Sequence, residues 1–274
     1  MTALVTRILS ALVLAPVALG AVYLGGSVYL AVLALAGILM AHELVRLVHA
    51  GCVKPQMFLH ALVVVLAIFG PALTALGPTA AVAGAIWLAS IALTRRSGRG
   101  NPWAALTIPY LFVPLISLVV LRLDQSWGLA AVLFVLAVTW ATDIAAYFSG
   151  RLIGGPKLSP TYSPNKTWAG LAGGVCAAAA TGVVAAALIG GTSGVMLGVL
   201  GGIFAIVAQL GDIAESAMKR FFRVKDSGTL IPGHGGILDR VDGLVAVATM
   251  ACAVGAAHAG AIVEAASGLL NWRF

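Results

Sequence analysis

Long apolar segments follow one another through almost the whole chain, and they restrict its fold more than any other feature. About 20 apolar residues are enough for one helix to cross the hydrocarbon core of a bilayer. Only 9% of the residues are charged and 61% are hydrophobic, whereas a soluble domain has about 25% charged residues. The sequence therefore predicts an all-α polytopic membrane protein and excludes an unusually apolar soluble domain. The nine predicted transmembrane helices cover residues 8–25, 27–47, 57–76, 78–94, 104–121, 128–149, 168–190, 193–211 and 243–263.

The basic residues predict how these nine spans are oriented. With the N-terminus placed in the cytoplasm, fourteen of the sixteen Lys and Arg residues fall on the cytoplasmic side, and only Arg122 and Arg273 fall outside. Lys and Arg collect in cytoplasmic loops of membrane proteins, so we expect a cytoplasmic N-terminus. The same bias accounts for the net charge of +7. No basic stretch is interleaved with aromatic residues, so nucleic acid is not an expected partner.

The chain is interpreted as a single integral membrane domain over residues 1–274. Residues 1–127 are expected to form the N-terminal spans, and residues 128–274 are expected to form the spans that hold the candidate catalytic residues given below. Two polar cytoplasmic loops, 150–167 and 212–242, belong to this second part. Small residues recur at Gly190, Gly194 and Gly198. They either let two helices approach closely or reflect the general abundance of glycine in membrane helices.

Charged residues are concentrated between positions 209 and 242, where an apolar chain would not place them for solubility alone. Five of the nine acidic residues lie here: Asp212, Glu215, Asp226, Asp239 and Asp242. Five basic residues lie here as well: Lys219, Arg220, Arg223, Lys225 and Arg240. Acidic and basic groups in this density suit a site that holds a cation together with phosphate oxygens.

The spacing within this segment indicates which of its residues act together. A helix that continues from the eighth span would place on one face Asp212, Glu215, Ser216 and Lys219. An ordinary solvated face is the alternative, but Asp212 directly follows an apolar run, and acidic groups near membrane depth are usually functional. The glycines around His234 allow a tight turn beside an anion, although a single histidine is more often structural. Asp212 and Asp239, from two neighbouring helix ends, can together hold Mg²⁺.

A second polar cluster begins inside the sixth span. Asp143 and Tyr147 are four residues apart and share a helical face. The loop that follows is bounded by glycine, stiffened by proline and rich in donors suited to phosphate. These donors are Lys157, Ser159, Ser163, Asn165, Lys166 and Thr167. A positive-inside anchor would explain the lysines but not the pattern of Pro, Ser and Gly.

The segment from Ser216 to Asp242 resembles the signature of the phosphatidate cytidylyltransferase (CDP-diacylglycerol synthase) family. It contains Ser-x-Met-Lys-Arg-x4-Lys-Asp-x-Gly-x2-Ile-Pro-x-His-Gly-Gly-Ile-x-Asp-Arg-Val-Asp. The run Ser163-Pro-Asn-Lys-Thr-Trp168 and the region 143–151 are similar to a second patch of that family. One departure is Ala169, where many relatives carry Glu, so no acidic role is expected at that position.

The resemblance implies that CTP and phosphatidate react in the cytoplasmic (inner) membrane of a bacterium, at the cytoplasmic side, to give CDP-diacylglycerol and diphosphate. It implies Mg²⁺ held by Asp212 and Asp239, with Asp143 and Asp242 as further ligands or neighbours, and leaves a second cation open. Catalytic roles are expected for Asp212, Asp239, Lys219, Arg220, Lys225 and His234. Substrate contacts are expected for Asp143, Tyr147, Lys157, Ser163, Lys166, Thr167, Glu215, Ser216, Asp226 and Arg240. Homodimer formation is left open.

Two alternative functions compete with this interpretation. A transporter or channel would explain Asp143, because acidic residues inside the membrane mark ion paths. However, the polar residues are gathered on one side, and no second entrance is apparent. A related enzyme could act on another lipid phosphate or nucleotide. Separately, His42 and Glu43 near the end of the second span either line the route of the lipid or serve in packing or capping.

Overall fold

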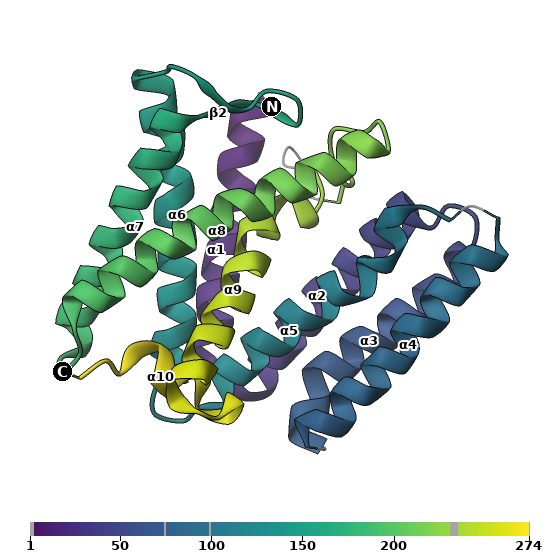
Figure 1. Cartoon of the computed structure of the whole chain (residues 1–274), viewed down its shortest axis with the longest axis horizontal. Helices are drawn as coiled ribbons and strands as arrows, with labels where there is room; N and C mark the ends of the chain where they lie inside the picture. The colour runs from purple at the N-terminus through teal and green to yellow at the C-terminus, as the bar shows by residue number, and fades with distance from the viewer. Residues whose placement is uncertain (1–2, 74, 99, 231–234, 274) are drawn as a thin grey trace. The chain divides into compact units, whose positions relative to one another are not determined.

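The computed structural model describes residues 3–73, 75–98, 100–230 and 235–273, with the backbone alone for 3–11, 72 and 73. Most of the described chain is helical (Figure 1). The α-helices are α1 (Ala3–Leu24), α2 (Gly26–Val48), α3 (Val53–Leu73), α4 (Leu76–Arg96), α5 (Thr107–Leu123), α6 (Gly128–Leu152), α7 (Trp168–Ile189), α8 (Gly194–Phe221), α9 (Leu238–Ala259) and α10 (Ala265–Leu270). Two short 3₁₀ helices are η1 (Pro102–Ala105) and η2 (Ile262–Glu264), and two strands are β1 (Lys157–Ser159) and β2 (Ser163–Thr167).

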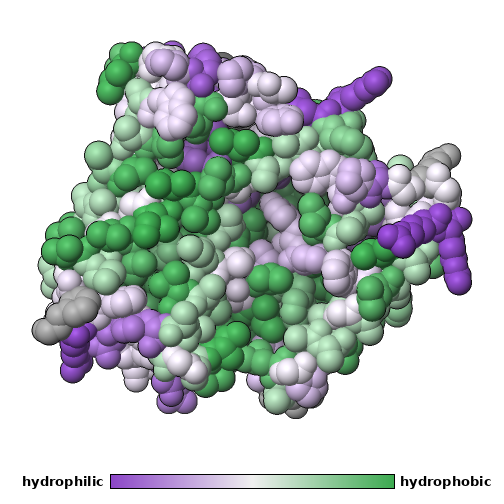
Figure 2. Space-filling model, viewed as in Figure 1, coloured by the Kyte–Doolittle hydropathy of each residue, from purple (hydrophilic) through white to green (hydrophobic). Residues whose placement is uncertain are grey.

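The prediction of an all-α polytopic membrane protein is confirmed. Within the described residues, eight helical segments are long and apolar enough to cross a membrane, and α1 adds a described apolar stretch, Leu12–Leu24. Hydrophobic residues cover much of the surface drawn in Figure 2, and apolar side chains such as Leu188 are 83% exposed. Such a surface is stable in lipid, where a helix satisfies its own backbone hydrogen bonds. The first predicted span, residues 8–25, and the cytoplasmic N-terminus stay predictions.

The chain forms two compact units, which are described separately. The first unit comprises Met1–Val119 and Met218–Val241, and the second comprises Val120–Ala217 and Asp242–Phe274. The segment from Met218 to Val241 therefore packs with the N-terminal helices, which the sequence did not indicate.

In the first unit, α2 packs on α1 and α3, and α3 packs on α4. An apolar cluster of Val63, Ile86 and Ile108 joins α3, α4 and α5. Gly37 allows α2 to lie against α3, because a Cβ atom there would approach Val64 Cγ1 to 2.8 Å. The Tyr29 hydroxyl ties α2 to α5 by donating to the Leu118 carbonyl at 3.0 Å.

A buried polar network also lies in the first unit, at the end of α2 and along α3. The two ring nitrogens of His49 lie 3.0 Å from Thr94 Oγ1 and 3.1 Å from Thr107 Oγ1. Thr107 Oγ1 is also 2.9 Å from His60 Nε2. Gln56 Nε2 donates to Thr94 Oγ1 at 2.9 Å. Buried polar side chains are normally paired in this way, because leaving one unpaired costs about 1–3 kcal/mol.

The second unit is built on close packing of α6 against α7. The buried positions of α7 are small residues four apart: Gly170, Gly174, Ala178, Gly182 and Ala186. At Gly182, and at Gly201 in α8, an added Cβ atom would overlap a backbone carbonyl of the other helix. Small residues thus let α7 and α8 approach closely. Of the glycines singled out from the sequence, Gly198 takes part, since its Cβ would lie 3.1 Å from Val183 Cγ2.

The predicted loop 150–167 contains structure that was not expected. After α6 ends at Leu152, β1 and β2 form an antiparallel hairpin in which Lys157 pairs with Thr167 and Ser159 with Ser163. The chain then enters α7 directly, because the Thr167 side chain caps it by accepting from Gly170 N at 3.0 Å. A Thr at this position satisfies an amide that the helix itself cannot.

Candidate active site

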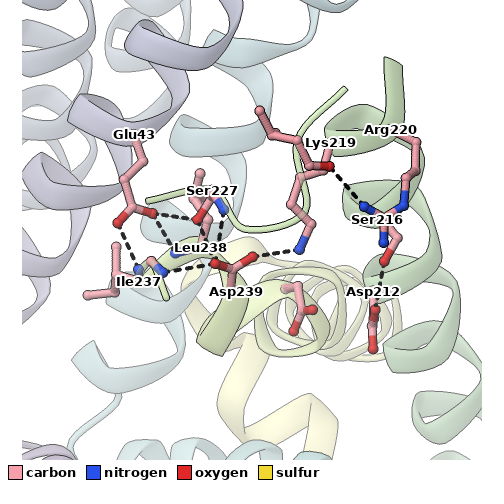
Figure 3. A network of polar contacts seen from close by, with 12 residues as sticks. Glu43, Asp212, Ser216, Lys219, Arg220, Ser227, Ile237, Leu238 and Asp239 are labelled. Atoms are coloured by element: carbon pink, nitrogen blue, oxygen red, sulfur yellow. Dashed lines mark hydrogen bonds and ion pairs between the residues drawn. The ribbon is translucent and has the colours of Figure 1, made fainter. Parts of the chain in front are cut away.

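A buried lysine–aspartate pair lies in the first unit (Figure 3). Lys219, near the end of α8, places its Nζ 2.5 Å from Oδ1 of Asp239, in the first turn of α9. The two side chains are 11% and 6% exposed. A charge-assisted hydrogen bond of this length, shielded from water, is among the stronger polar contacts in a protein. Two of the six residues expected to be catalytic are therefore brought together.

Backbone amides occupy the other oxygen of Asp239. Oδ2 accepts from Gly236 N at 2.8 Å and from Ser227 N at 3.0 Å, and the Ser227 hydroxyl lies 3.1 Å away. The backbone can approach because Gly235 has a φ of 81°, and a Cβ atom at Gly235 would lie 2.8 Å from Oδ2. Glycine tolerates both the positive φ and the close approach. Both oxygens of Asp239 are thus engaged within the protein.

Glu43 of α2 completes this group of residues. Its side chain is buried, and its two oxygens accept from Ser227 Oγ at 2.8 Å, Ile237 N at 2.9 Å and Leu238 N at 3.0 Å. From the sequence, two roles are open for Glu43: lining the route of the lipid, or packing or capping. Its hydrogen bonds to the amides at the start of α9 assign it to capping. The signal that could have found it is an acidic residue inside an apolar segment.

A second lysine–aspartate pair lies in the second unit. Lys166 Nζ, on strand β2, is 2.6 Å from Oδ2 of Asp212 on α8, and the side chains are 15% and 32% exposed. The Ser216 hydroxyl donates to Asp212 Oδ1 at 3.3 Å, which confirms that these two residues share a helical face. Lys166 Nζ also lies 3.4 Å from the Gln209 carbonyl. This pair joins the predicted phosphate loop to the predicted acidic helix.

Asp242, in α9, is the acidic residue of the second unit that relates Asp212 to two further carboxylates. The carboxylate of Asp242 interacts electrostatically with those of Asp212, Glu215 and Asp143. Glu215 is buried, whereas Asp143 is exposed. Oxygen donors of this kind are the ligands that Mg²⁺ prefers. In the part of the chain that the structure describes, however, no three acidic, His or Cys side chains are grouped as a metal site. The donor chemistry fits a hard cation, but the ligand set is not assembled.

The helices that carry these acids are close because of one glycine. A Cβ atom at Gly211 in α8 would lie 2.8 Å from the backbone oxygen of Asp242 and 2.8 Å from Ala246 Cβ in α9. Only a residue without a side chain allows this approach without displacing the backbone. Gly211 therefore brings Asp242 next to the segment that carries Asp212.

Most of the remaining predicted site residues are exposed on the surface of the protein. Exposed positions are those of Tyr147, Lys157, Arg220, Lys225, Asp226 and Arg240, while Ser163 is half-buried in β2. Arg220 donates to the Val224 carbonyl at 2.9 Å, and Tyr147 accepts from Arg151 at 3.0 Å. Thr167 caps α7, and its predicted substrate contact stays a prediction. His234 lies outside the described residues.

The joint cation site of Asp212 and Asp239 also stays a prediction. Asp212 belongs to the second unit and Asp239 to the first. Each carboxylate is bound to its own lysine.

Comparisons with known proteins test the family resemblance of the segment from Ser216 to Asp242. A model described as the cytidylyltransferase family matches residues 5–257. A phosphatidate cytidylyltransferase of Brucella suis biovar 1 is 49% identical over 164 residues, which cover 60% of this chain and 60% of that protein. A protein of the same name from Bacillus subtilis is 42% identical over 127 residues, covering 46% and 47%. One from Haemophilus influenzae is 42% identical over 128 residues, covering 45% and 44%. The chain thus spans at most about three-fifths of the length of these relatives.

Proposed function

The chain belongs to the cytidylyltransferase family, and from that premise we propose that it transfers the CMP moiety of CTP to phosphatidate, giving CDP-diacylglycerol and diphosphate. The observation that carries the proposal is the paired arrangement of the signature residues. Lys219 and Asp239 both belong to the Ser216–Asp242 signature and form one cation–carboxylate pair. Lys166, from the second patch that resembles the family, forms the other pair with Asp212, which lies four residues before the signature. The names of the relatives support phosphatidate as the substrate.

In the proposed reaction, an oxygen of the phosphatidate phosphate attacks the α-phosphorus of CTP. A new P–O bond forms, the bond to the β-phosphate breaks, and diphosphate leaves with the electron pair. The attacking phosphate is already an anion, so little base catalysis is required. The protein has to bring two polyanions together and compensate the charge that develops on the leaving group.

Lysine and arginine side chains are proposed to supply that compensation. Lys219 and Lys166 are held in place by carboxylates, and a phosphate oxygen competes for the same ammonium protons. Arg220, Lys225 and Arg240 are exposed and can reach an incoming nucleotide. His234, which lies outside the described residues, keeps its proposed phosphate contact. A substrate contact is proposed on the resemblance alone for Tyr147, Lys157, Ser163, Thr167 and Asp226.

Mg²⁺ is proposed as the cofactor. The residues that would hold it are Asp212 and Asp239, with Asp143 and Asp242 as further ligands or neighbours. When bound, the ion would neutralise phosphate charge and favour departure of diphosphate. Lys219 occupies one oxygen of Asp239, so this carboxylate would have to release Lys219 in order to ligate a cation.

The proposed site faces the cytoplasm of a bacterial cell, at the inner membrane. This placement rests on the distribution of Lys and Arg and on the bacterial relatives.

The test is direct synthesis of the lipid product. Purified full-length protein in detergent is incubated with CTP labelled at the α-phosphate, phosphatidate and Mg²⁺, and the lipid fraction is analysed. We expect label in CDP-diacylglycerol and one diphosphate released for each lipid formed. ATP, GTP and UTP, offered in turn, test whether the nucleotide is CTP. Absence of any labelled lipid would overturn the proposal and favour the transporter alternative.

A further inference from the structure

Glu43 is an acidic residue placed where its charge must be compensated. It lies on α2 and is 3% exposed. A carboxylate removed from water is costly unless hydrogen bonds replace its hydration. Three donors do so: the Ser227 hydroxyl and the backbone amides of Ile237 and Leu238. All three belong to the segment that leads from α8 into α9.

Two of these donors are amides at the N-terminus of α9. The first amides of a helix have no partner within the helix, and its N-terminal end favours negative charge. Here the carboxylate comes from α2, almost 200 positions earlier in the chain, rather than from a local capping residue. Glu43 therefore fixes where α9 begins relative to α2, and Asp239 lies in that first turn.

Ser227 links Glu43 directly to Asp239. Its hydroxyl lies 2.8 Å from Glu43 Oε2 and 3.1 Å from Asp239 Oδ2. The Ser227 amide donates to the same Asp239 oxygen. The series of contacts continues from Asp239 to Lys219, whose Nζ donates to Asp239 Oδ1 (Figure 3). Glu43, Ser227, Asp239 and Lys219 thus form one continuous polar series.

The glycines of this segment fit around Glu43. At Gly228, a Cβ atom would lie 2.8 Å from Glu43 Oε1, and at Gly236 it would overlap both the Ser227 hydroxyl and the Glu43 carboxylate. Side chains at these positions would displace the carboxylate. The signature glycines therefore make room for a residue that lies outside the signature.

We propose that Glu43 is a positioning residue, which acts through Ser227 and the amides of Ile237 and Leu238 to orient Asp239 and Lys219 for the reaction. The proposal rests on the proposed function for its effect on turnover, but its effect on the segment 227–239 is independent of that function.

The test compares E43Q, S227A, the double variant and a control, E264Q. Gln has the shape of Glu but turns one acceptor into a donor that faces the amides. Glu264 is exposed in η2, so E264Q removes one acidic charge elsewhere. Two quantities are measured in purified full-length protein: deuterium uptake of peptides covering 226–240, and kcat and KM for CTP in the synthesis of CDP-diacylglycerol.

In E43Q we expect faster exchange of the amides of Ser227, Gly236, Ile237 and Leu238. We also expect kcat to fall about 10- to 100-fold, the size seen when a group that orients an active-site ligand is lost, with KM changed less than kcat. The double variant should be no slower than E43Q, because both changes break one series of contacts. E264Q should behave like the wild type.

Other outcomes overturn the proposal. A purely structural cap would lower the yield or melting temperature of E43Q while folded protein kept the kcat of the wild type. If the fold-decrease in kcat of the double variant equals the product of those of E43Q and S227A, the two residues act independently. If E43Q does not fold, the S227A variant tests the proposal alone. Unchanged kcat and unchanged deuterium uptake in S227A would then overturn it. If the wild type makes no CDP-lipid, the proposed function fails, and unchanged exchange in E43Q or S227A would then overturn the positioning role separately.

Discussion

The Lys219–Asp239 pair of the first unit and the Lys166–Asp212 pair of the second use the same two residue types in different surroundings. The first pair is 11% and 6% exposed, and both oxygens of Asp239 are held, one by Lys219 and the other by backbone amides. The second pair is 15% and 32% exposed, and Asp212 has other acids near it. Surrounding hydrogen bonds therefore hold the first pair in one geometry. The more open second pair is better suited to exchange partners when a charged substrate arrives.

The largest expected effect is on turnover, and it should appear in both units. Asp239→Asn and Asp212→Asn each remove a charge beside a lysine that is proposed to contact phosphate. We expect either variant to lose at least about 100-fold in CDP-diacylglycerol synthesis, comparable to removing one stabilising group from a transition state. The assay with labelled CTP measures this, with E264Q as the control. Near-normal synthesis by either variant would contradict a role for that carboxylate.

Removing the lysine should destabilise the folded protein more in the first pair than in the second. Lys219→Met leaves Asp239 buried without its cation, which costs about 3 kcal/mol. Lys166→Met leaves Asp212 with access to water, which costs at most about 1 kcal/mol. Thermal unfolding in detergent can be followed with a thiol-reactive dye once Cys52 and the exposed Cys176 are replaced by Ser, because the remaining Cys252 is buried in the folded chain. Equal losses of melting temperature in the two variants would remove the distinction drawn between the pairs.

The dependence on Mg²⁺ should be strongest for the acids of the second unit. Chelation with EDTA is expected to stop synthesis, and added Mg²⁺ to restore it. Asp242→Asn should raise the Mg²⁺ concentration for half-maximal activity about 10-fold, the lower end of the effects seen when groups around a metal are lost. Glu264→Gln, which also removes one acidic charge, should not shift it. Synthesis that persists in EDTA would rule out the divalent cofactor.

The smallest expected effect is on the pH dependence of stability, and it belongs to the first unit. Burial, and then the charge of the nearby His60, lower the pKa of His49 to about 4 from an ordinary 6.5. His49 therefore binds a proton below about pH 6.5 in the unfolded chain, but only below about pH 4 in the folded chain. Stability should fall as the pH drops through this interval.

His49→Gln tests this origin. The variant should lose less melting temperature between pH 7 and pH 5 than the wild type does, whatever its starting value. His258, the histidine of the second unit, stacks on Trp272 with ring centroids 3.6 Å apart and provides the matched substitution, His258→Gln. A variant of His49 with the full acid sensitivity of the wild type would show that the effect arises elsewhere.

Much of the architecture was predictable because the physical rule behind it is local. A run of about 20 apolar residues must satisfy its backbone within itself, so the spans follow from hydropathy. The shared face of Asp212 and Ser216 follows from helical spacing. The hairpin at 157–167 was not predicted, since short strands of Lys, Ser, Pro and Thr carry no apolar alternation. The grouping of Met218–Val241 with the N-terminal helices has no local signal either.

The sequence by itself determined the membrane class, most of the helical spans and the residue types that meet at the candidate site, because these depend on composition and on spacing along one helix. Only the tertiary structure decided which lysine binds which aspartate and that Glu43, from α2, holds the start of α9. Those choices depend on which distant backbone amides and side chains come within about 3 Å of each other. That distance is set by the close packing of helices around glycine and is not encoded in any single segment.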